Sequence, residues 1–316
     1  MTALATVDEQ AVRRTYLGGP AVAAIVGVSP HQSPIDVYRF LRGLDDGPEQ
    51  TDRMRLGLIL EDAIAAAYTE QTGRRLRRVG LVRHRTIPFL GGHPDRDVIG
   101  EPGLVEMKAS ATSRGYSEDD VPAHVRVQTT WYMGLMGREW CDVVLLAGMS
   151  LRPVRVDFDA ELYDALETAA VRFWRDHIEA GVEPEPDGSD SYRRHLAEKF
   201  PRHVDLELIA TPEQALLVEE LRAAELARKA AVQHEDEIEN RILRGMGDAA
   251  VLIAPGARLT WKLEAPRTRW KDVAETMAQD LDALQAANLL AGYVKRDKEG
   301  REGSRVPRRH WAKEEA

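Results

Sequence analysis

The sequence predicts an α/β protein, with a mixed sheet core flanked by helices and a mainly helical C-terminal appendage. Three observations carry this prediction. Apolar residues recur at helical spacing over residues 18–73, and short, partly alternating segments broken by Gly and Pro follow over residues 77–110. Helical and strand patterns then alternate to about residue 180. The acidic, proline-containing stretch 183–191 suggests a connection, so we expect a core over residues 1–190 and an appendage of unknown role over 191–316.

The first third is predicted to be helical because each apolar run has its own start and stop signals. Gly18-Gly19-Pro20 begins an alanine-rich helix, since proline suits a first helical position. Ser33-Pro34 provides an N-cap and first residue for a second helix, which Gly43 ends. A third helix is expected over residues 53–72, before Gly73.

The middle of the chain changes period. Strands are expected over the following segments: 77–84, 87–95, 96–100, 104–110, 141–149 and 151–159. The first four resemble strands of an antiparallel sheet. Residues 125–137 and 161–181 have helical spacing and frame the last two strands. Strands framed by helices give the α/β core.

The appendage begins with a clear helix signal. Thr211 and Gln214 fit a capping box, and the helix that they start is expected to reach Gly245. Residues 201–316 can be a partner-binding appendage, a DNA clamp or a self-association element. An apolar stripe that includes Leu217 and Leu221 favours a helical hairpin packed on the core. A β-hairpin near residues 251–264, another helix through about Leu290 and a basic tail are expected to follow.

The composition is that of a globular protein, with 43% hydrophobic and 30% charged residues. The single cysteine, Cys141, excludes an internal disulfide framework and lies in an apolar run, which favours a buried structural thiol. We find no membrane-spanning run and no signal peptide, so we expect a cytoplasmic protein.

Charge is distributed unevenly along the chain. The net charge of −9 argues against unspecific coating of nucleic acid, but not against a locally basic groove. Arginines crowd residues 74–85, and basic residues crowd 305–313. Each cluster can be a solvated face, which is the commoner explanation, or a surface that contacts phosphates.

The stretch 91–110, GGHPDRDVIGEPGLVEMKAS, places charged residues inside a strand pattern. If Gly100 to Gly103 form the turn of a hairpin, Asp97 faces Glu106 and Asp95 faces Lys108. Strand parity then places these four side chains on one face and Val98, Val105 and Met107 on the core face. A solvated hairpin with a charged outer face would give the same pattern.

Three carboxylates on one face repel each other unless a cation lies between them. Hard divalent cations, Mg²⁺ above all, bind one or two carboxylates, retain several waters and leave room for a phosphate oxygen. Such a metal activates water for phosphodiester hydrolysis, and a neighbouring lysine can orient that water or stabilise the transition state. The scattered histidines and lone cysteine disfavour zinc.

Pro94-Asp95, followed by Glu106-Met107-Lys108, resembles the PD-(D/E)xK nuclease signature. Gly57 to Glu61 lie on a helix before the sheet, and Val121-Pro122 precede Gln128 on the next helix. Together with Gly18 to Ala21 and Val28 to Pro34, this order resembles the YqaJ-like viral recombinases, relatives of phage lambda exonuclease. The resemblance covers roughly residues 10–180.

The resemblance implies a restriction-endonuclease-like core and an exonuclease that uses Mg²⁺, or Mn²⁺ as a substitute, to resect duplex DNA 5′ to 3′ for recombination by strand annealing. It implies that Asp95, Glu106 and Glu61 bind the metal. Lys108 would serve the attacking water and Gln128 would hold the site. It also implies a homo-oligomer, by resemblance a ring trimer, and a single-strand annealing protein as partner.

An arginine before the Gly-Gly turn holds the terminal phosphate in the same family. Arg13 fits by spacing, and Arg14 is a close rival. The chain departs from the family at three places: Pro20 replaces a serine after Gly-Gly, Thr130 replaces a second glutamine, and Asp97 is an additional acid. Asp97 is either an extra ligand or, as we favour, a solvated bystander.

Other functions remain open at this stage. A Cas4-like or RecB-like enzyme usually has the cysteines of an iron–sulfur cluster, which a lone cysteine cannot provide. An endonuclease for branched or single-stranded DNA fits the same residues. A DNA-end-binding scaffold that has lost catalysis would be expected to lack an acid or the lysine, yet Asp95, Glu106 and Lys108 are all present.

Overall fold

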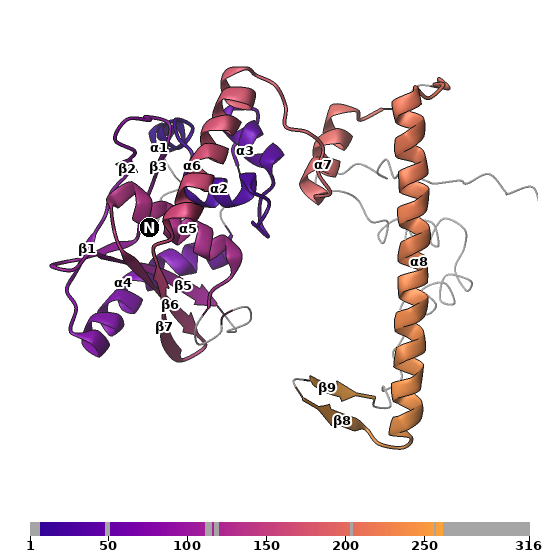
Figure 1. Cartoon of the computed structure of the whole chain (residues 1–316). Helices are drawn as coiled ribbons and strands as arrows, with labels where there is room; N and C mark the ends of the chain where they lie inside the picture. The colour runs from indigo at the N-terminus through magenta and orange to yellow at the C-terminus, as the bar shows by residue number, and fades with distance from the viewer. Residues whose placement is uncertain are drawn as a thin grey trace, which may run out of the picture. The chain divides into compact units, whose positions relative to one another are not determined.

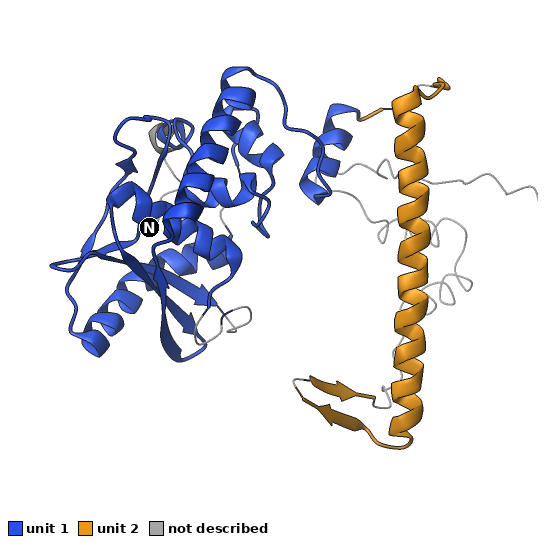
Figure 2. Cartoon of the chain, in the orientation of Figure 1, with its two compact units in different colours: residues 1–200 blue, residues 201–316 orange. Residues whose placement is uncertain are grey.

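The computed structural model describes residues 7–47, 51–110, 116, 120–202, 205–255 and 257–261. The chain forms two compact units, residues 1–200 and 201–316 (Figure 2). The predicted helix ending near Leu290 and the basic tail lie outside the described residues. No helix among the described residues has both the length and the apolar character needed to cross a membrane.

The first unit contains a mixed five-stranded sheet of order β1-β4-β5-β6-β7 (Figure 1). The strands are β1 (Leu76–Arg78), β4 (Arg96–Val98), β5 (Gly103–Ser110), β6 (Trp140–Ala147) and β7 (Ser150–Asp157). A small pair, β2 (Val82–Arg83) and β3 (Gly91–Gly92), lies outside this sheet. Only β5 and β6 pair in parallel, because α5 (Ala123–Met136) crosses over between them. The predicted α/β fold with a mixed sheet is confirmed.

Helices cover both faces of the sheet. The helices of the first unit are α1 (Val7–Arg13), α2 (Gly19–Ile25), α3 (Pro34–Leu41), α4 (Asp52–Thr72), α5, α6 (Ala160–Phe173), the π-helix η1 (Trp174–Glu179) and α7 (Asp190–Lys199). One apolar core joins α2, α3, α5 and α6 to the sheet face that carries Leu104 and Val143. A second core joins α4 to the opposite face, through Val105 and Val144. Buried Cys141 belongs to the first core, as predicted.

Local signals explain where these helices begin and end. Thr51 caps α4 by accepting a hydrogen bond from the Met54 N–H at 3.2 Å, and Gly73 ends the helix with φ of 72°. Asp36 accepts from the Ser33 N–H at 2.9 Å at the start of α3. The predicted N-terminal helices are therefore present with the expected caps.

The predicted hairpin register is wrong by two residues. Asp97 pairs with Leu104 and Arg96 with Val105, so Asp95 continues beside Glu106 and not beside Lys108. The turn is wider than predicted because, beyond Asp97, β4 continues to pair with β1 and the Ile99 N–H donates to the Arg75 carbonyl at 2.8 Å. A shift of two residues preserves strand parity, so the assignment of residues to the two faces holds.

The second unit contains α8 (Pro212–Met246) and a hairpin of β8 (Val251–Ala254) and β9 (Ala257–Thr260). The predicted capping box is present: the Gln214 N–H donates to Thr211 Oγ1 at 3.2 Å, and the Thr211 N–H donates to Gln214 Oε1 at 3.0 Å. The predicted helix and the hairpin strands are thus confirmed within this unit.

Candidate active site

The candidate site is an acidic and amide cluster at the side of β5 that faces α5. Glu106 is 3% exposed and lies between Lys108 and Gln128. Lys108 Nζ donates to Glu106 Oε1 at 2.7 Å, and Gln128 Nε2 donates to the same oxygen at 2.8 Å. Lys108 Nζ also donates to Gln128 Oε1 at 3.1 Å. The three side chains form a closed hydrogen-bonded group.

Asp95 joins this group from the start of β4. Its Oδ2 accepts a hydrogen bond from the Met107 N–H at 2.7 Å, which fixes the carboxylate against β5. One oxygen each of Asp95 and Glu106 is thereby used. Within the described residues, the second oxygen of each carboxylate accepts no hydrogen bond, so each remains available to a ligand.

Glu61 approaches from the other face of the sheet. It lies on α4, and its Oε2 is 4.0 Å from Arg96 Nη1. Arg96 Nη2 also donates to Asp62 Oδ1 at 2.7 Å, so this arginine fixes the acidic turn of α4 against β4. The structure therefore brings Glu61 near Asp95, whose charge contributes, after burial, to raising the pKa of Glu61.

The pKa values of the three acids, Glu61, Asp95 and Glu106, are all raised. Burial and the neighbouring Asp95 raise the pKa of Glu106 to about 7. Burial also raises the pKa of Asp95, and burial followed by the charge of Asp95 raises that of Glu61. Burial alone would lower the pKa of Lys108, but Glu106 and Asp95 outweigh it and raise that pKa. The site therefore favours the charged form of Lys108 and disfavours the ionised forms of the three carboxyl groups.

The predicted cluster does not form a closed metal cage. Among the described residues, no group of three or more His, Cys, Asp and Glu side chains is placed to hold a metal ion. The charge of Glu61 nevertheless contributes to raising the pKa of Glu106, after burial and Asp95, so the three carboxylates are near enough to interact. Two carboxylates with hard oxygen atoms remain, which suits an ion that retains several waters.

Asp97 lies outside this group. It is 2% exposed, and it accepts hydrogen bonds from Arg77 Nη2 at 2.6 Å and from Arg138 Nε at 2.8 Å. These two guanidiniums outweigh burial and lower the pKa of Asp97. The prediction that Asp97 is solvated is therefore wrong, because its side chain is buried and forms ion pairs with two arginines.

The two candidate phosphate ligands differ. Arg14 Nη2 donates to the Asp45 carbonyl at 2.9 Å and to Asp46 Oδ1 at 3.0 Å, so it holds the loop after α3. Arg13 is exposed at the end of α1, and its charge contributes to lowering the pKa of His93, two residues before Asp95. Of the two arginines, Arg13 is the one whose charge, after burial, acts on the pKa of His93.

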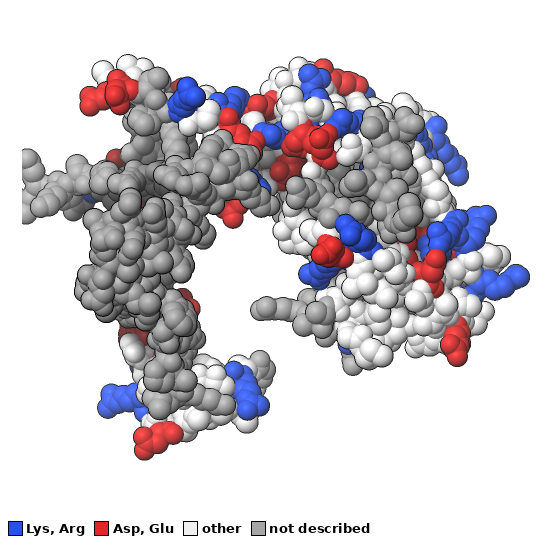
Figure 3. All heavy atoms as spheres, turned by 180° about the vertical axis from the view of Figure 1, so that it is seen from behind, with Lys and Arg blue, Asp and Glu red and all other residues white. Residues whose placement is uncertain are grey.

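The arginine cluster over residues 74–85 is largely paired. Arg74 binds Asp142 and Glu101, Arg77 binds Asp97, and Arg78 binds Asp62. On the face shown in Figure 3, acidic and basic side chains of the described residues are interspersed. Ion pairing within the fold therefore accounts for much of this cluster.

Two supporting features were not predicted from the sequence. Tyr132, one helical turn after Gln128, accepts a hydrogen bond from Gln128 Nε2 at 3.2 Å. Gly19 lets α2 approach α5, because a Cβ at this position would lie 3.0 Å from Gln128 Cγ. The i,i+4 spacing of Gln128 and Tyr132 was a usable signal.

Thr130, which replaces a glutamine of the family, is buried with no partner for its hydroxyl within the described part of the chain.

The fold and this cluster define a class: an α/β protein with a Pro-Asp and Glu-x-Lys group on adjacent strands of a mixed sheet. Residues 10–139 match the model of the YqaJ-like viral recombinase domain, so the resemblance is confirmed over this part of the chain. The chain is also 26% identical over 264 residues to the uncharacterized protein YqaJ of Bacillus subtilis (strain 168), which covers 79% of this chain and 81% of that protein.

Two solved structures are similar in part. The alkaline exonuclease LHK-Exo from Laribacter hongkongensis has 25% identity and a TM-score of 0.49, covering 61% of this chain and all of that one. A phage-related exonuclease from Haemophilus somnus 129PT has 12% identity and a TM-score of 0.40, covering 55% of this chain and 99% of that one. With TM-scores below 0.5, these two similarities carry no conclusion about this chain.

Proposed function

We propose that this protein is a metal-dependent DNA exonuclease that resects duplex DNA 5′ to 3′ and so supplies single strands for recombination by annealing. One observation carries the proposal: Glu106, Lys108 and Gln128 form a single hydrogen-bonded group beside Asp95. The viral recombinase domain over residues 10–139 supports DNA as the substrate.

The donor set fits Mg²⁺, with Mn²⁺ as a substitute. Asp95 and Glu106 offer hard oxygen atoms. Burial raises the pKa values of both, and the charge of Asp95 adds to the rise at Glu106, so a bound cation would stabilise their ionised forms. We assign Asp95, Glu106 and Glu61 as the residues that would hold the metal. When bound, the metal polarises the phosphoryl oxygen and makes water a better nucleophile.

The remaining residues bind and orient. Lys108 keeps its proton beside Glu106, so its ammonium can donate a hydrogen bond to the attacking water or to a phosphoryl oxygen. Gln128 binds both Glu106 and Lys108 and fixes their separation. Arg13 is assigned to the 5′-terminal phosphate, because it is exposed and near His93, whereas Arg14 already binds Asp46.

The test is digestion of duplex DNA labelled at one 5′ or one 3′ end, with Mg²⁺ or with EDTA. We expect labelled 5′ nucleotides to be released first, with Mg²⁺ and not with EDTA. Lys108→Ala and Glu61→Ala should lower the rate by at least about a hundredfold, as loss of one transition-state contact does in other enzymes. Release of 3′ label first would contradict the polarity.

A matched control uses an acid of the same hairpin outside the cluster. Glu101 is exposed and pairs with Arg74, so Glu101→Ala should digest DNA at the normal rate. Normal digestion by Lys108→Ala would overturn the site assignment. Cleavage of closed circular or branched DNA without a free end would favour an endonuclease, and DNA binding without cleavage would favour a scaffold.

We further propose that the protein acts in the cytoplasm as a homo-oligomer, a trimer by resemblance, together with a single-strand annealing protein. A ring that encloses DNA would make digestion processive. Sedimentation equilibrium of the full chain would give the mass, and a processivity assay with excess unlabelled competitor DNA would test the enclosure.

A further inference from the structure

The long helix α8 carries a stripe of mostly exposed residues with apolar residues at both ends, of which Ile242 is half-buried. Along this stripe, residues recur at alternating intervals of four and three, from Leu217 to Ile242. We call them the α8 seam: Leu217, Leu221, Ala224, Arg228, Ala231, Glu235, Ile238 and Ile242. Leu217 is 63% exposed, Leu221 40% and Ile238 43%. An exposed seam of this spacing is the pattern of a helix that pairs with another helix.

The seam has an ordered composition. Its two ends are apolar, Leu217 with Leu221 and Ile238 with Ile242. In its middle, the small residues Ala224 and Ala231 alternate with the charged residues Arg228 and Glu235. A partner must therefore supply large apolar side chains at both ends, and small and oppositely charged ones in the middle.

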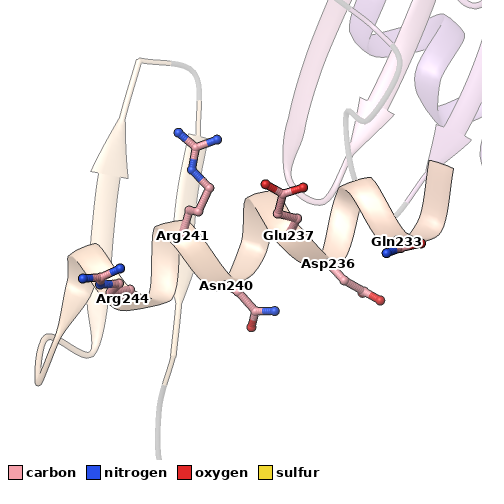
Figure 4. A pocket seen from close by; sticks show the side chains of 6 residues that line it. All are labelled: Gln233, Asp236, Glu237, Asn240, Arg241 and Arg244. Carbon is pink, nitrogen blue, oxygen red and sulfur yellow. The ribbon is translucent and has the colours of Figure 1, made fainter. Parts of the chain in front are cut away.

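A pocket lies beside another, polar side of α8. A hollow of about 430 Å³ is lined by the residues that Figure 4 shows, Gln233, Asp236, Glu237, Asn240, Arg241 and Arg244. Both charge signs occur there, and none of the six belongs to the seam. The apolar pairing surface is thus distinct from this hollow.

We propose that the α8 seam binds the same seam of a second copy of this chain, antiparallel. When Arg228 is placed against Ala231 of the second copy, Leu221 lies against Ile238 and Leu217 against Ile242. Ala224 then lies against Glu235. Every large side chain in this register meets a small or an apolar one, and Arg228 lies one layer from Glu235 of the second copy. Two-fold symmetry makes each contact twice.

The charges of Arg228 and Glu235 disfavour other arrangements of two α8 seams. A parallel pair in register would place Arg228 against Arg228 and Glu235 against Glu235 inside the seam, where like charges are costly. An antiparallel pair shifted by seven residues would place Arg228 against Ile238. In the proposed register, Glu220 also lies near Arg241 of the second copy at the border of the seam, which adds an opposite-charge pair.

The first test reverses the seam charges in the full-length protein. Arg228→Glu alone and Glu235→Arg alone should each weaken self-association through α8 by about tenfold or more, because like charges then meet twice per dimer. The double variant Arg228→Glu with Glu235→Arg should restore it to within about threefold of wild type. The measurement is sedimentation equilibrium over a dilution series at low salt.

The second test fixes the register by disulfide formation. Ala224→Cys with Glu235→Cys puts two thiols in facing layers, so oxidation should give a covalent dimer that does not extend to larger products. The matched control, Ala223→Cys with Asp236→Cys, has the same sum of residue numbers but lies off the seam, and should stay uncrosslinked. Wild type serves as the background, since its one thiol, Cys141, is buried.

The outcomes separate the possible occupants of the seam. A double reversal no better than either single reversal would mean that another surface, such as residues 262–316 of the same chain, covers the seam, and would overturn the proposal. Equal crosslinking of the control pair would also overturn it. A trimer formed by the first unit would persist in the charge variants and would not form the seam disulfide.

Discussion

Glu106 and Asp97 are buried acids on neighbouring strands, 3% and 2% exposed, yet their pKa values move in opposite directions. Asp97 is bound by the guanidiniums of Arg77 and Arg138, which lower its pKa. Glu106 has Lys108 as its cation but also has Asp95 beside it, and its pKa rises to about 7. Burial is the largest cause of the raised pKa of Glu106, and the charge of Asp95 adds to it, whereas two guanidiniums outweigh burial at Asp97.

The difference separates a structural acid from a functional one. Two cations satisfy the charge of Asp97 within the fold, so this carboxylate has no need of a ligand. The pKa values of Asp95 and Glu106 are raised by burial although Lys108 is near both and Arg96 is near Asp95, so an added cation lowers the free energy of their ionised forms. We therefore expect substitutions at the two places to have opposite effects on activity and on stability.

The largest effect is expected at Glu106. Glu106→Gln removes a metal ligand and should lower the DNA digestion rate by at least about a thousandfold, because both the metal and the transition state lose a contact. At pH 7 and without metal, the free energy of unfolding should change by less than about 1 kcal/mol, since repulsion with Asp95 is relieved as the bond to Lys108 weakens. Single-turnover digestion and urea unfolding measure the two quantities.

Asp97→Asn should show the reverse. Removing one charge from a buried ion network leaves Arg77 and Arg138 without their partner and should lower the free energy of unfolding by about 3 kcal/mol. The folded fraction should still digest DNA at a rate within about threefold of wild type. Loss of activity in a fully folded Asp97→Asn protein would instead place Asp97 in the site.

The sequence predicted the faces of the hairpin better than its register. Alternation correctly separates Glu106 and Lys108 from Val105 and Met107, because side chains in a strand point to opposite faces. The register depended on the turn, and no local signal indicated that Val98 pairs with Leu76 of β1 beyond Asp97. A long-range contact decided what the local sequence left open.

The same limit applies to the partners of each acid. The spacing of Glu106, Lys108 and Gln128 predicted residues that the structure does bring together. Arg138 lies just after α5 and returns to Asp97 over 41 positions of sequence, which no local pattern reveals. Whether a buried acid has enough cations nearby to keep its pKa low therefore depends on long-range contacts in the fold, which the motif does not reveal.

The pH dependence should sharpen the comparison. A carboxyl group with a raised folded pKa favours the folded state below its unfolded pKa, near 4.5 for Glu106, and this contribution is lost as pH rises to about 7. Asp97, with a lowered pKa, contributes constantly over this window and loses its contribution only as pH falls below about 4.

In EDTA, wild type should therefore lose about 2 kcal/mol of unfolding free energy relative to Glu106→Gln between pH 4.5 and 7. Urea unfolding at several pH values measures this difference. Mg²⁺ should raise the wild-type Tm more at pH 8 than at pH 5, because metal binding requires ionised carboxylates. If the difference in unfolding free energy between the two proteins did not change with pH, the pKa of Glu106 would not be raised in the folded state.

The smallest expected effect concerns Arg13 and Arg14, which repeat the contrast between a free and a paired charge. Arg14 binds Asp46 and the Asp45 carbonyl, whereas Arg13 is exposed and has no ion pair with a described residue. Arg13→Ala should slow digestion of 5′-phosphorylated ends by about tenfold, the loss of one charged contact, and leave 5′-hydroxyl ends unchanged. Arg14→Ala should lower the Tm and slow both ends equally, if at all. Initial rates on the two kinds of end, measured with the same duplex, separate the two arginines, and a phosphate-specific defect in Arg14→Ala would reverse the assignment.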